Sequence, residues 1–171
     1  AGDTKVVQKG GADKLFINTA GVGSVESDVN ISGANAQVDD VVIISGTLGD
    51  HGIAVISARE GLNFETDLRS DVAPLNHLIA AMMNAGEIHV LRDPTRGGLA
   101  TTLNEIASQS NLTVELQETT LPVKPQVHAA CEMLGFDPLY VANEGKLVAF
   151  VKSEDAEKIL SVMHQTRYGE E

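Results

Sequence analysis

The chain has 171 residues, of which 43% are hydrophobic, and its formal net charge at pH 7 is −12. This length allows one sizeable globular domain together with a piece of a second, and the hydrophobic content suffices for a core. The negative charge argues against nucleic acid and against an anionic membrane surface as partners, because their phosphates would be repelled. It does not exclude ATP, because Lys, Arg and Mg²⁺ can hold a nucleotide locally on an acidic protein.

The sequence gives no sign of a membrane span, a secretion signal or a metal site. The longest apolar run covers residues 78–83 only, whereas a helix needs roughly 20 apolar residues to cross a bilayer. The first residues lack the charged and then apolar pattern of a secretion signal. Cys131 is the single cysteine and cannot form an internal disulfide, which fits the reducing cytoplasm and predicts a structural role. The five histidines lack the spacing of metal ligands.

The predicted elements begin with two strands, residues 4–7 and 15–18, which a turn at residues 10–11 joins into a hairpin. Residues 21–37 are rich in Gly, Ser, Asn and Ala, which predicts a linker or a mobile loop. A strand of the buried type follows at residues 41–45.

The rest of the chain mixes helices and strands. A helix is expected from Asp50 to about Arg59, ended by Gly61, and the polar residues 62–73 predict a loop. The further predicted elements are a helix from Pro74 to residue 85, a strand at 88–91, a helix at 98–109, an alternating strand at 112–116, a helix at 124–134, a strand at 146–151 and a last helix capped by Ser153. Because strands and helices mix without strict alternation, the predicted fold class is α+β.

The most informative stretch, LRDPTRGGLATTLNEIA, places a short strand directly before an amphipathic helix. At the junction stand Asp93, Thr95, Arg96, Gly97 and Gly98. Unpaired backbone N–H groups and the positive end of the helix dipole gather at a helix N-terminus, where anions bind. A guanidinium binds phosphate through paired hydrogen bonds, and adjacent glycines permit close backbone approach. The alternative is a capped turn, in which proline fixes φ and glycine eases the bend.

A second polar group, Asp3, Thr4 and Lys5, stands near the start of the chain. A carboxylate can hold Mg²⁺, and a lysine ammonium can neutralise phosphate or move a proton. On pattern alone, a solvated strand edge is the simpler interpretation.

Two glycine-containing turns are open to more than one interpretation. Residues 46–52, GTLGDHG, follow a strand and open a helix without the spacing of a P-loop. Either His51 contacts an anion there, or Asp50 caps a tight strand-to-helix turn. Residues 143–146, NEGK, lie between two apolar runs, and as a bare pattern they predict a hairpin turn.

Four segments together resemble HypE-type hydrogenase maturation proteins, members of the aminoimidazole-ribonucleotide-synthetase-like ATP-binding superfamily. In chain order the segments are GDTKVV from Gly2, GDHGIA from Gly49 with the later REG, DPTRGGLA from Asp93 and VANEGK from Val141. The resemblance runs from Gly2 to about residue 150. It implies the tail end of the N-terminal ATP-binding domain with a linker at residues 1–37, and the C-terminal α/β domain at residues 38–171.

The resemblance also implies roles for individual residues. The catalytic candidates are Lys5, Arg96 and Glu144. The candidates for contact with ATP are Asp3, Thr4, Asp93, Thr95, Gly97 and Asn143, with Asp3 also as the Mg²⁺ ligand. Lys5 and Arg96 suit charge neutralisation or proton transfer, and Glu144 suits a general base.

The family's reaction is an ATP-dependent dehydration. A partner enzyme carbamoylates a C-terminal cysteine, the resulting S-carboxamide becomes a thiocyanate, and the cyanide passes to the iron of [NiFe]-hydrogenase. The resemblance therefore implies two partners, a carbamoyl-transferring maturation protein and a scaffold–chaperone complex that accepts cyanide. It also implies a homodimer of the full-length protein and a cytoplasmic location.

The chain departs from the family pattern at its ends. The family's terminal cysteine with its tail, the last strand or strands of the C-terminal domain and most of the ATP-binding domain have no counterpart in this sequence. By itself the chain is therefore expected neither to turn over nor to carry the carbamoyl group. Two alternatives stay open. One is a sister ATP-dependent synthetase or kinase of the same superfamily, and the other is a docking module for maturation partners.

Overall fold

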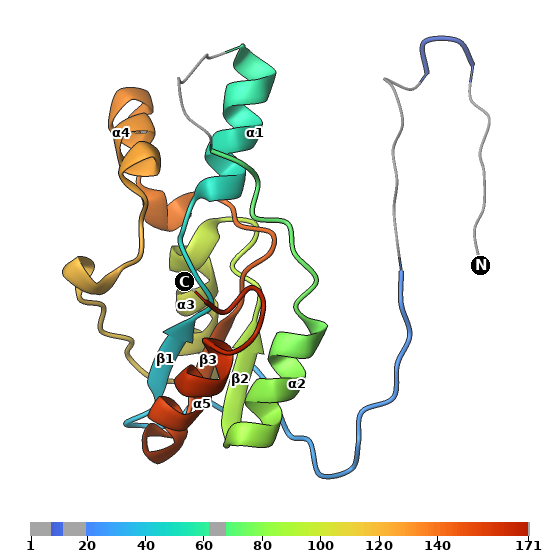
Figure 1. The fold of residues 1–171 in the computed structure, drawn as a ribbon, viewed down its shortest axis with the longest axis vertical. Coiled ribbons are helices and arrows are strands. Elements are labelled where there is room, and N and C mark those ends of the chain that lie inside the picture. The colour runs from blue at the N-terminus through green and yellow to red at the C-terminus, as the bar shows by residue number, and fades with distance from the viewer. Residues whose placement is uncertain (1–7, 12–19, 62–67, 171) are drawn as a thin grey trace.

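The computed structural model describes residues 8–11, 20–61 and 68–170, and Figure 1 shows their course. A three-stranded antiparallel sheet lies at the centre, in the order β1 (Val41–Ile44), β3 (Val148–Val151), β2 (Ile88–Arg92). Val151 pairs with Val41 on one side and with Ile88 on the other, and a β-bulge interrupts β2 after Ile88. The last strand in the sequence is thus the central strand of the sheet.

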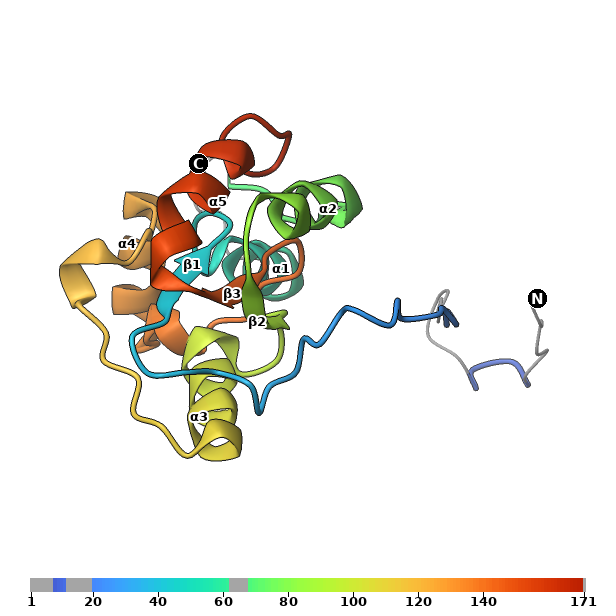
Figure 2. The ribbon, with the colours of Figure 1, turned by 90° about the horizontal axis from the view of Figure 1, so that it is seen from below.

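Helices cover both faces of the sheet, as Figure 2 shows. On one face α2 (Asn76–Ala85) and α5 (Ala156–Met163) pack against Ala149 and Val151. On the other face α3 (Gly98–Ser110) packs against Val148 and Phe150. Because successive strand residues point to opposite faces, the all-apolar β3 supplies both cores and is buried along its whole length.

A third apolar cluster lies beyond the end of the sheet, where α1 (Asp50–Glu60) and α4 (Pro125–Leu134) pack together (Figure 1). Ile53, Val127 and Cys131 are almost wholly buried in it. Burial raises the pKa of the Cys131 thiol above its ordinary value, and the nearby Asp137 carboxylate raises it further. Cys131 therefore behaves as a small buried hydrophobe, in line with its predicted structural role.

Most of the predicted helices and strands are confirmed, with ends that differ by a few residues. The α+β class is confirmed as well. The last helix begins at Ala156 rather than directly after Ser153, because a 3₁₀ turn at Ser153–Asp155 precedes it. Likewise α2 begins two residues after Pro74. The hairpin expected at residues 4–7 and 15–18 lies outside the described residues.

The strand expected at residues 112–116 is wrong, since this segment forms no ladder with the sheet. Its alternating pattern reflects Val114, which packs against the apolar cluster between α3 and the sheet. Alternation shows that one side of a segment is buried, but it does not show that a strand edge stands opposite. The backbone then passes through a 3₁₀ turn at Glu118–Thr120.

Part of the expected linker at residues 21–37 is fixed to the domain. The N–H of Ser32 donates to the carbonyl of His89 in β2, at 3.1 Å. The hydroxyl of Ser110, at the end of α3, donates to the carbonyl of Gly33 and accepts from the N–H of Ala36. Contacts with the sheet and with α3 therefore start several residues before the domain boundary expected at 37/38.

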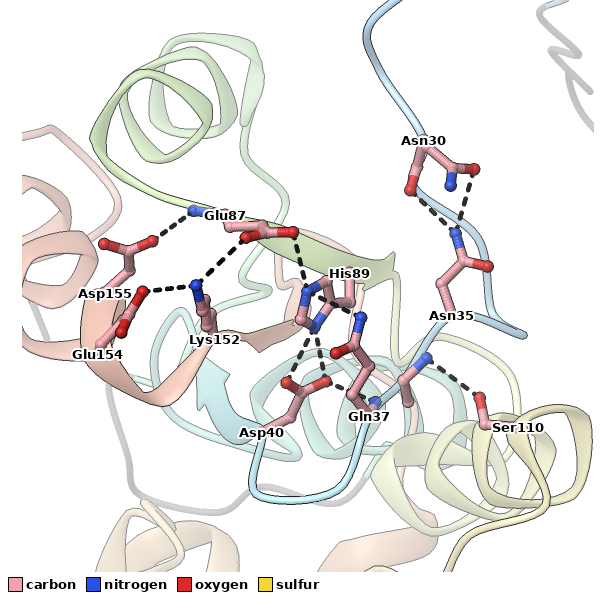
Figure 3. Close-up of polar contacts among 11 residues, drawn as sticks. Asn30, Asn35, Gln37, Asp40, Glu87, His89, Ser110, Lys152, Glu154 and Asp155 are labelled. Carbon is pink, nitrogen blue, oxygen red and sulfur yellow. Dashed lines mark hydrogen bonds and ion pairs between the residues drawn. The ribbon is translucent and has the colours of Figure 1, made fainter.

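A polar cluster around the buried His89 side chain completes this attachment (Figure 3). Nδ1 of His89 lies 2.9 Å from the Asp40 carboxylate, and its Nε2 lies 3.3 Å from Oε1 of Glu87. Gln37 reaches the same Nε2 with its side-chain amide. His89 and Asp40 are more than nine-tenths buried, so the cluster ties the start of β1 to β2 inside the protein.

Within the described residues no helix is both long and apolar enough to cross a bilayer.

Candidate functional site

Asn143 brings three of the four informative segments together. Its side-chain oxygen accepts from the N–H of Gly49 at 2.8 Å, and its side-chain nitrogen donates to the carbonyls of Pro94 and Val141. The backbone N–H of Asn143 also donates to Pro94. The residue is fully buried. One amide therefore joins the turn before α1, the turn before α3 and the segment before β3.

The turn before α3 depends on its two glycines. Gly97 is the N-cap residue with φ 80°, and Gly98 follows with φ 64°. A Cβ on Gly98 would lie 2.4 Å from the carbonyl oxygen of Leu139 and 2.8 Å from that of Val141. Only glycine combines this backbone conformation with such close approach. The α3 N-terminus is thereby pressed against the segment that leads into Asn143.

The polar side chains of this turn face outward. The Thr95 hydroxyl donates to the Asp93 carboxylate at 2.6 Å, and Asp93 is 61% exposed. Arg92 is bound to Glu105 at 2.9 Å. Arg96 is exposed and has no hydrogen bond or ion pair within the described part of the chain. Of the two arginines, Arg96 is therefore the one whose guanidinium is open to a ligand.

Glu144 is held by its backbone and leaves its carboxylate half-exposed. The N–H groups of Glu144 and Gly145 both donate to Oδ1 of Asp71, at 3.1 and 3.4 Å. A Cβ on Gly145 would collide with the backbone of Asp71 and Ala73. This close contact between two segments that are distant in sequence fixes the backbone position from which the Glu144 side chain extends. The hairpin expected at residues 143–146 is wrong. No strand ends directly before Asn143, and the turn is bonded to Asp71 instead.

His51 lies beside Glu144 at the start of α1. Its Nδ1 is 2.8 Å from the Ser70 hydroxyl, and its Nε2 is 3.9 Å from Oε1 of Glu144. Asp50 does not cap the helix as expected, since Gly49 with φ 84° is the N-cap and Asp50 is already helical. The Asp50 carboxylate instead accepts from Thr47 and pairs with Lys124 at 2.9 Å.

Two hollows flank the Glu144 turn. One, of about 610 Å³, is lined by His51, Arg59 and Asp137 and by apolar residues that include Ile56 and Phe136. The other, of about 530 Å³, is lined by Asp71, Lys146 and Lys124 and by apolar residues that include Leu68. The turn that carries Glu144 therefore lies between two hollows, each lined by both charged and apolar side chains.

Several of the predicted site residues come together, and others lie outside the described residues. Arg96, Asp93, Thr95, Gly97, Asn143 and Glu144 all belong to the connected turns. Asn143 faces protein backbone rather than solvent, so its observed contacts are internal. Asp3, Thr4 and Lys5 are not described. No pattern in the sequence singled out Ser70 or Asp71, whose importance comes from segments that meet only in the fold.

The fold is that of a domain from the AIR synthase superfamily. The family model described as "AIR synthase related protein, C-terminal domain" matches residues 37–170, and the chain belongs to this family. It is also similar to HypE-type proteins. It is 60% identical over 164 residues to a carbamoyl dehydratase HypE from Bradyrhizobium diazoefficiens, covering 95% of this chain and 47% of that protein.

Solved structures agree. The chain superposes on HypE in the crystal structure of a HypE–HypF complex with a TM-score of 0.80 and 54% identity, over 82% of this chain and 47% of that one. For the crystal structure of the hydrogenase maturation protein HypE in complex with ATP, the TM-score is 0.79 and the identity 50%, over 82% and 42% of the two chains. The chain thus spans about half the length of the relatives it matches. These similarities, at 50 to 60% identity, are to proteins described as HypE.

Proposed function

We propose that this chain forms the C-terminal half of an ATP-dependent carbamoyl dehydratase of [NiFe]-hydrogenase maturation. The substrate is the S-carboxamide of a carbamoylated C-terminal cysteine, and the product is a thiocyanate that supplies cyanide for iron. The observation that carries the proposal is the connection made by Asn143, which holds the turn of Arg96 and the turn of Glu144 in one unit.

The chemistry requires a better leaving group and a base. An amide oxygen leaves poorly, and ATP, when bound, supplies the phosphoryl group that converts it into a departing phosphate. Glu144 has a half-exposed carboxylate on a backbone fixed by Asp71, which suits a general base that removes the carboxamide N–H protons. Arg96 offers an exposed guanidinium at the N-terminus of α3, where an anionic phosphate is stabilised.

The residues described fit a nucleotide in part. The glycine turn at the start of α3 and the Arg96 guanidinium provide the positive side of a phosphate site. The proposed Mg²⁺ ligand Asp3 and the proposed catalytic Lys5 belong to the undescribed start of the chain. No group of three or more His, Cys, Asp or Glu residues that could hold a metal ion occurs within the described residues. On the basis of the family resemblance, we propose Asp3 as the residue that would hold Mg²⁺ beside the phosphates.

The proposed partners follow from the relatives. A HypE-type relative has been solved in complex with HypF, so we propose that a carbamoyl-transferring protein of that kind modifies the cysteine here. A scaffold–chaperone complex that accepts cyanide and a homodimer of the full-length protein complete the proposal. The cytoplasm is the proposed compartment, on the ground that Cys131 is unpaired and buried.

A chimera tests the proposal, with this chain replacing the matching segment of the Bradyrhizobium diazoefficiens relative. We expect the Glu144→Gln variant to lower the dehydration rate at least about 100-fold, because the amide cannot accept the proton. We expect Arg96→Ala to raise the KM for ATP about tenfold or more, because a charge-assisted contact is lost. Mass spectrometry of the carbamoylated cysteine follows the reaction as the loss of one water.

The matched control is Arg92→Ala, since the Arg92 guanidinium is already occupied by Glu105; its KM for ATP should stay near that of the parent chimera. Binding of the carbamoyl-transferring partner is measured in parallel. A Glu144→Gln chimera that dehydrates normally would exclude the proposed base. Loss of partner binding without loss of dehydration would instead favour a docking module.

A further inference from the structure

His51 lies between the Ser70 hydroxyl, which can orient its imidazole, and the Glu144 carboxylate, with which it can exchange a proton. Its Nδ1 is within hydrogen-bond distance of Ser70, and its Nε2 faces Glu144 at 3.9 Å. When Nδ1 carries the proton and donates to the Ser70 hydroxyl, Nε2 presents a lone pair toward the carboxylate. The Nε2–Oε1 distance is longer than a hydrogen bond, but contacts of this kind often shorten when substrate is bound.

We propose that His51 is a positioning residue that acts through Glu144: it takes up the proton that Glu144 removes and so returns the carboxylate to its basic form. The inference rests on the proposed function, because it assigns a partner to the proposed base. The two residues reach each other from separate elements, His51 from the start of α1 and Glu144 from the segment before β3. Ser70 and Asp71, adjacent in sequence, hold the imidazole and the backbone of Glu144 respectively.

The proton balance is simple. The carboxamide nitrogen loses two protons, and Glu144 accepts them one after the other. The electron pair of the first N–H bond forms the C=N bond as the carboxamide oxygen takes the phosphoryl group that ATP would supply. The electron pair of the second N–H bond goes into the C≡N bond as the C–O bond to the departing phosphate breaks. The carboxylic acid then passes its proton to Nε2 of His51, which restores the carboxylate and leaves an imidazolium. The imidazolium returns its proton to solvent, to which it has access because the His51 side chain is 21% exposed. No oxidant or further reactant is needed.

The fold around His51 does not depend on its ring. The start of α1 is fixed by backbone contacts, from the N–H of Gly49 to Asn143 and from the N–H of Gly52 to the carbonyl of Ala142. A Cβ on Gly52 would lie 2.4 Å from Val141, so this turn stays closely packed whatever residue 51 is. Truncation of His51 should therefore leave α1 and the Glu144 turn in place.

The hollow beside His51 offers a direct test. It measures about 610 Å³ and is lined by the imidazole itself, so free imidazole can enter the space that a truncated side chain vacates. In the chimera we expect His51→Ala to lower the dehydration rate about 30-fold or more. Cysteine carbamoylation and the KM for ATP should stay close to those of the parent. Imidazole at tens of millimolar should restore most of the lost rate, which it cannot do if the residue is only structural.

Three variants complete the experiment. His51→Asn can keep a hydrogen bond to Ser70 but cannot take up the proton, so it should be folded, slow and insensitive to imidazole. Glu144→Gln should be slow and also insensitive, since its defect lies before the relay. His77→Ala, an exposed histidine of α2, is the control and should behave as the parent does.

The inference is overturned if His51→Ala or His51→Asn dehydrates at the parental rate, or if the His51→Ala defect does not respond to imidazole. Should His51→Ala fail to fold, as judged by circular dichroism, the rate of His51→Asn decides. The proposed function fails separately, if the parent chimera forms no thiocyanate from the carbamoylated cysteine.

Discussion

At the scale of single residues, Asn143 shows how one buried polar side chain can connect several turns. Its amide oxygen and amide nitrogen are both engaged by protein groups, and the residue has no exposed surface. A buried polar group that loses its hydrogen-bond partner destabilises the protein by more than the intact hydrogen bond stabilises it, because water forms similar bonds in the unfolded state. Asn143 is therefore a joint between turns, which holds the turn of Glu144 and the turn of Arg96 in fixed relation.

This argument predicts a large loss of stability in Asn143→Ala. The substitution leaves the N–H of Gly49 and the carbonyl of Pro94 buried with fewer partners, so the free energy of unfolding should fall by about 3 kcal/mol. Urea denaturation followed by circular dichroism measures it. Asn104→Ala is the matched control, because Asn104 is exposed on α3 and bonds only to its own helix. A loss below about 1 kcal/mol in Asn143→Ala would contradict the proposed role of Asn143 in holding the turns together.

At the scale of elements, the site is made where helices begin. The turn before α1 and the turn before α3 each start with a glycine in the left-handed region, Gly49 and Gly97. The C-terminus of α4 uses the same conformation at Gly135, with φ 71°. The surroundings differ, since a Cβ at Gly135 would meet nothing within 4 Å whereas one at Gly98 would meet backbone. At Gly135 glycine is required for the backbone conformation alone. At Gly98 it is required both for the backbone conformation and for the close packing against neighbouring backbone.

A pair of substitutions separates the effect of backbone conformation from the effect of close packing. Gly135→Ala should cost about 1 to 2 kcal/mol, the strain of an L-residue in the left-handed region. Gly98→Ala carries the same strain and also drives a methyl group into the backbone of Leu139 and Val141, so it should cost at least about 2 kcal/mol more. Urea denaturation compares the two variants. Equal losses would mean that the α3 N-terminus can move away from residues 139–141.

Element prediction from the sequence succeeded where one local cause dominates. The apolar face of α3 predicted the position of that helix within a few residues. Residues 112–116 had an equally regular pattern, yet a strand needs a partner edge as well as a buried side. Residues 143–146 have the composition of a hairpin turn, but their hydrogen bonds go to Asp71. No local pattern carries information about a partner so far away in the sequence.

At the scale of the whole molecule, the three-stranded sheet is reinforced where the chain enters it. The buried side chains of Asp40 and His89, together with the more exposed Glu87, join β1 to β2 around the central strand (Figure 3). The Ser110 hydroxyl adds a second attachment by bonding Gly33 and Ala36 to the end of α3. The segment before β1 is thus part of the folded unit.

Hydrogen exchange tests this attachment. In Ser110→Ala the N–H of Ala36 loses its acceptor, and we expect its amide to exchange about tenfold faster, which corresponds to the loss of one or two hydrogen bonds. Nuclear magnetic resonance resolves the rate residue by residue. Ser108→Ala, two residues earlier on the exposed side of α3, should leave it unchanged. The attachment is excluded if both variants match the parent.

The sequence by itself determined the fold class, the position of most helices and strands, the family, and the two turns that carry Arg96 and Glu144. Those features are local, because they follow from apolar periodicity, from glycine and proline, and from short runs of residues that stand together in the chain. Only the tertiary structure decided that Asn143 joins these turns, that Asp71 fixes Glu144, and that His51 and Ser70 stand beside it. These contacts join segments about 20 to 90 residues apart in sequence, and their partners are chosen by packing of the whole domain rather than by any neighbouring residue.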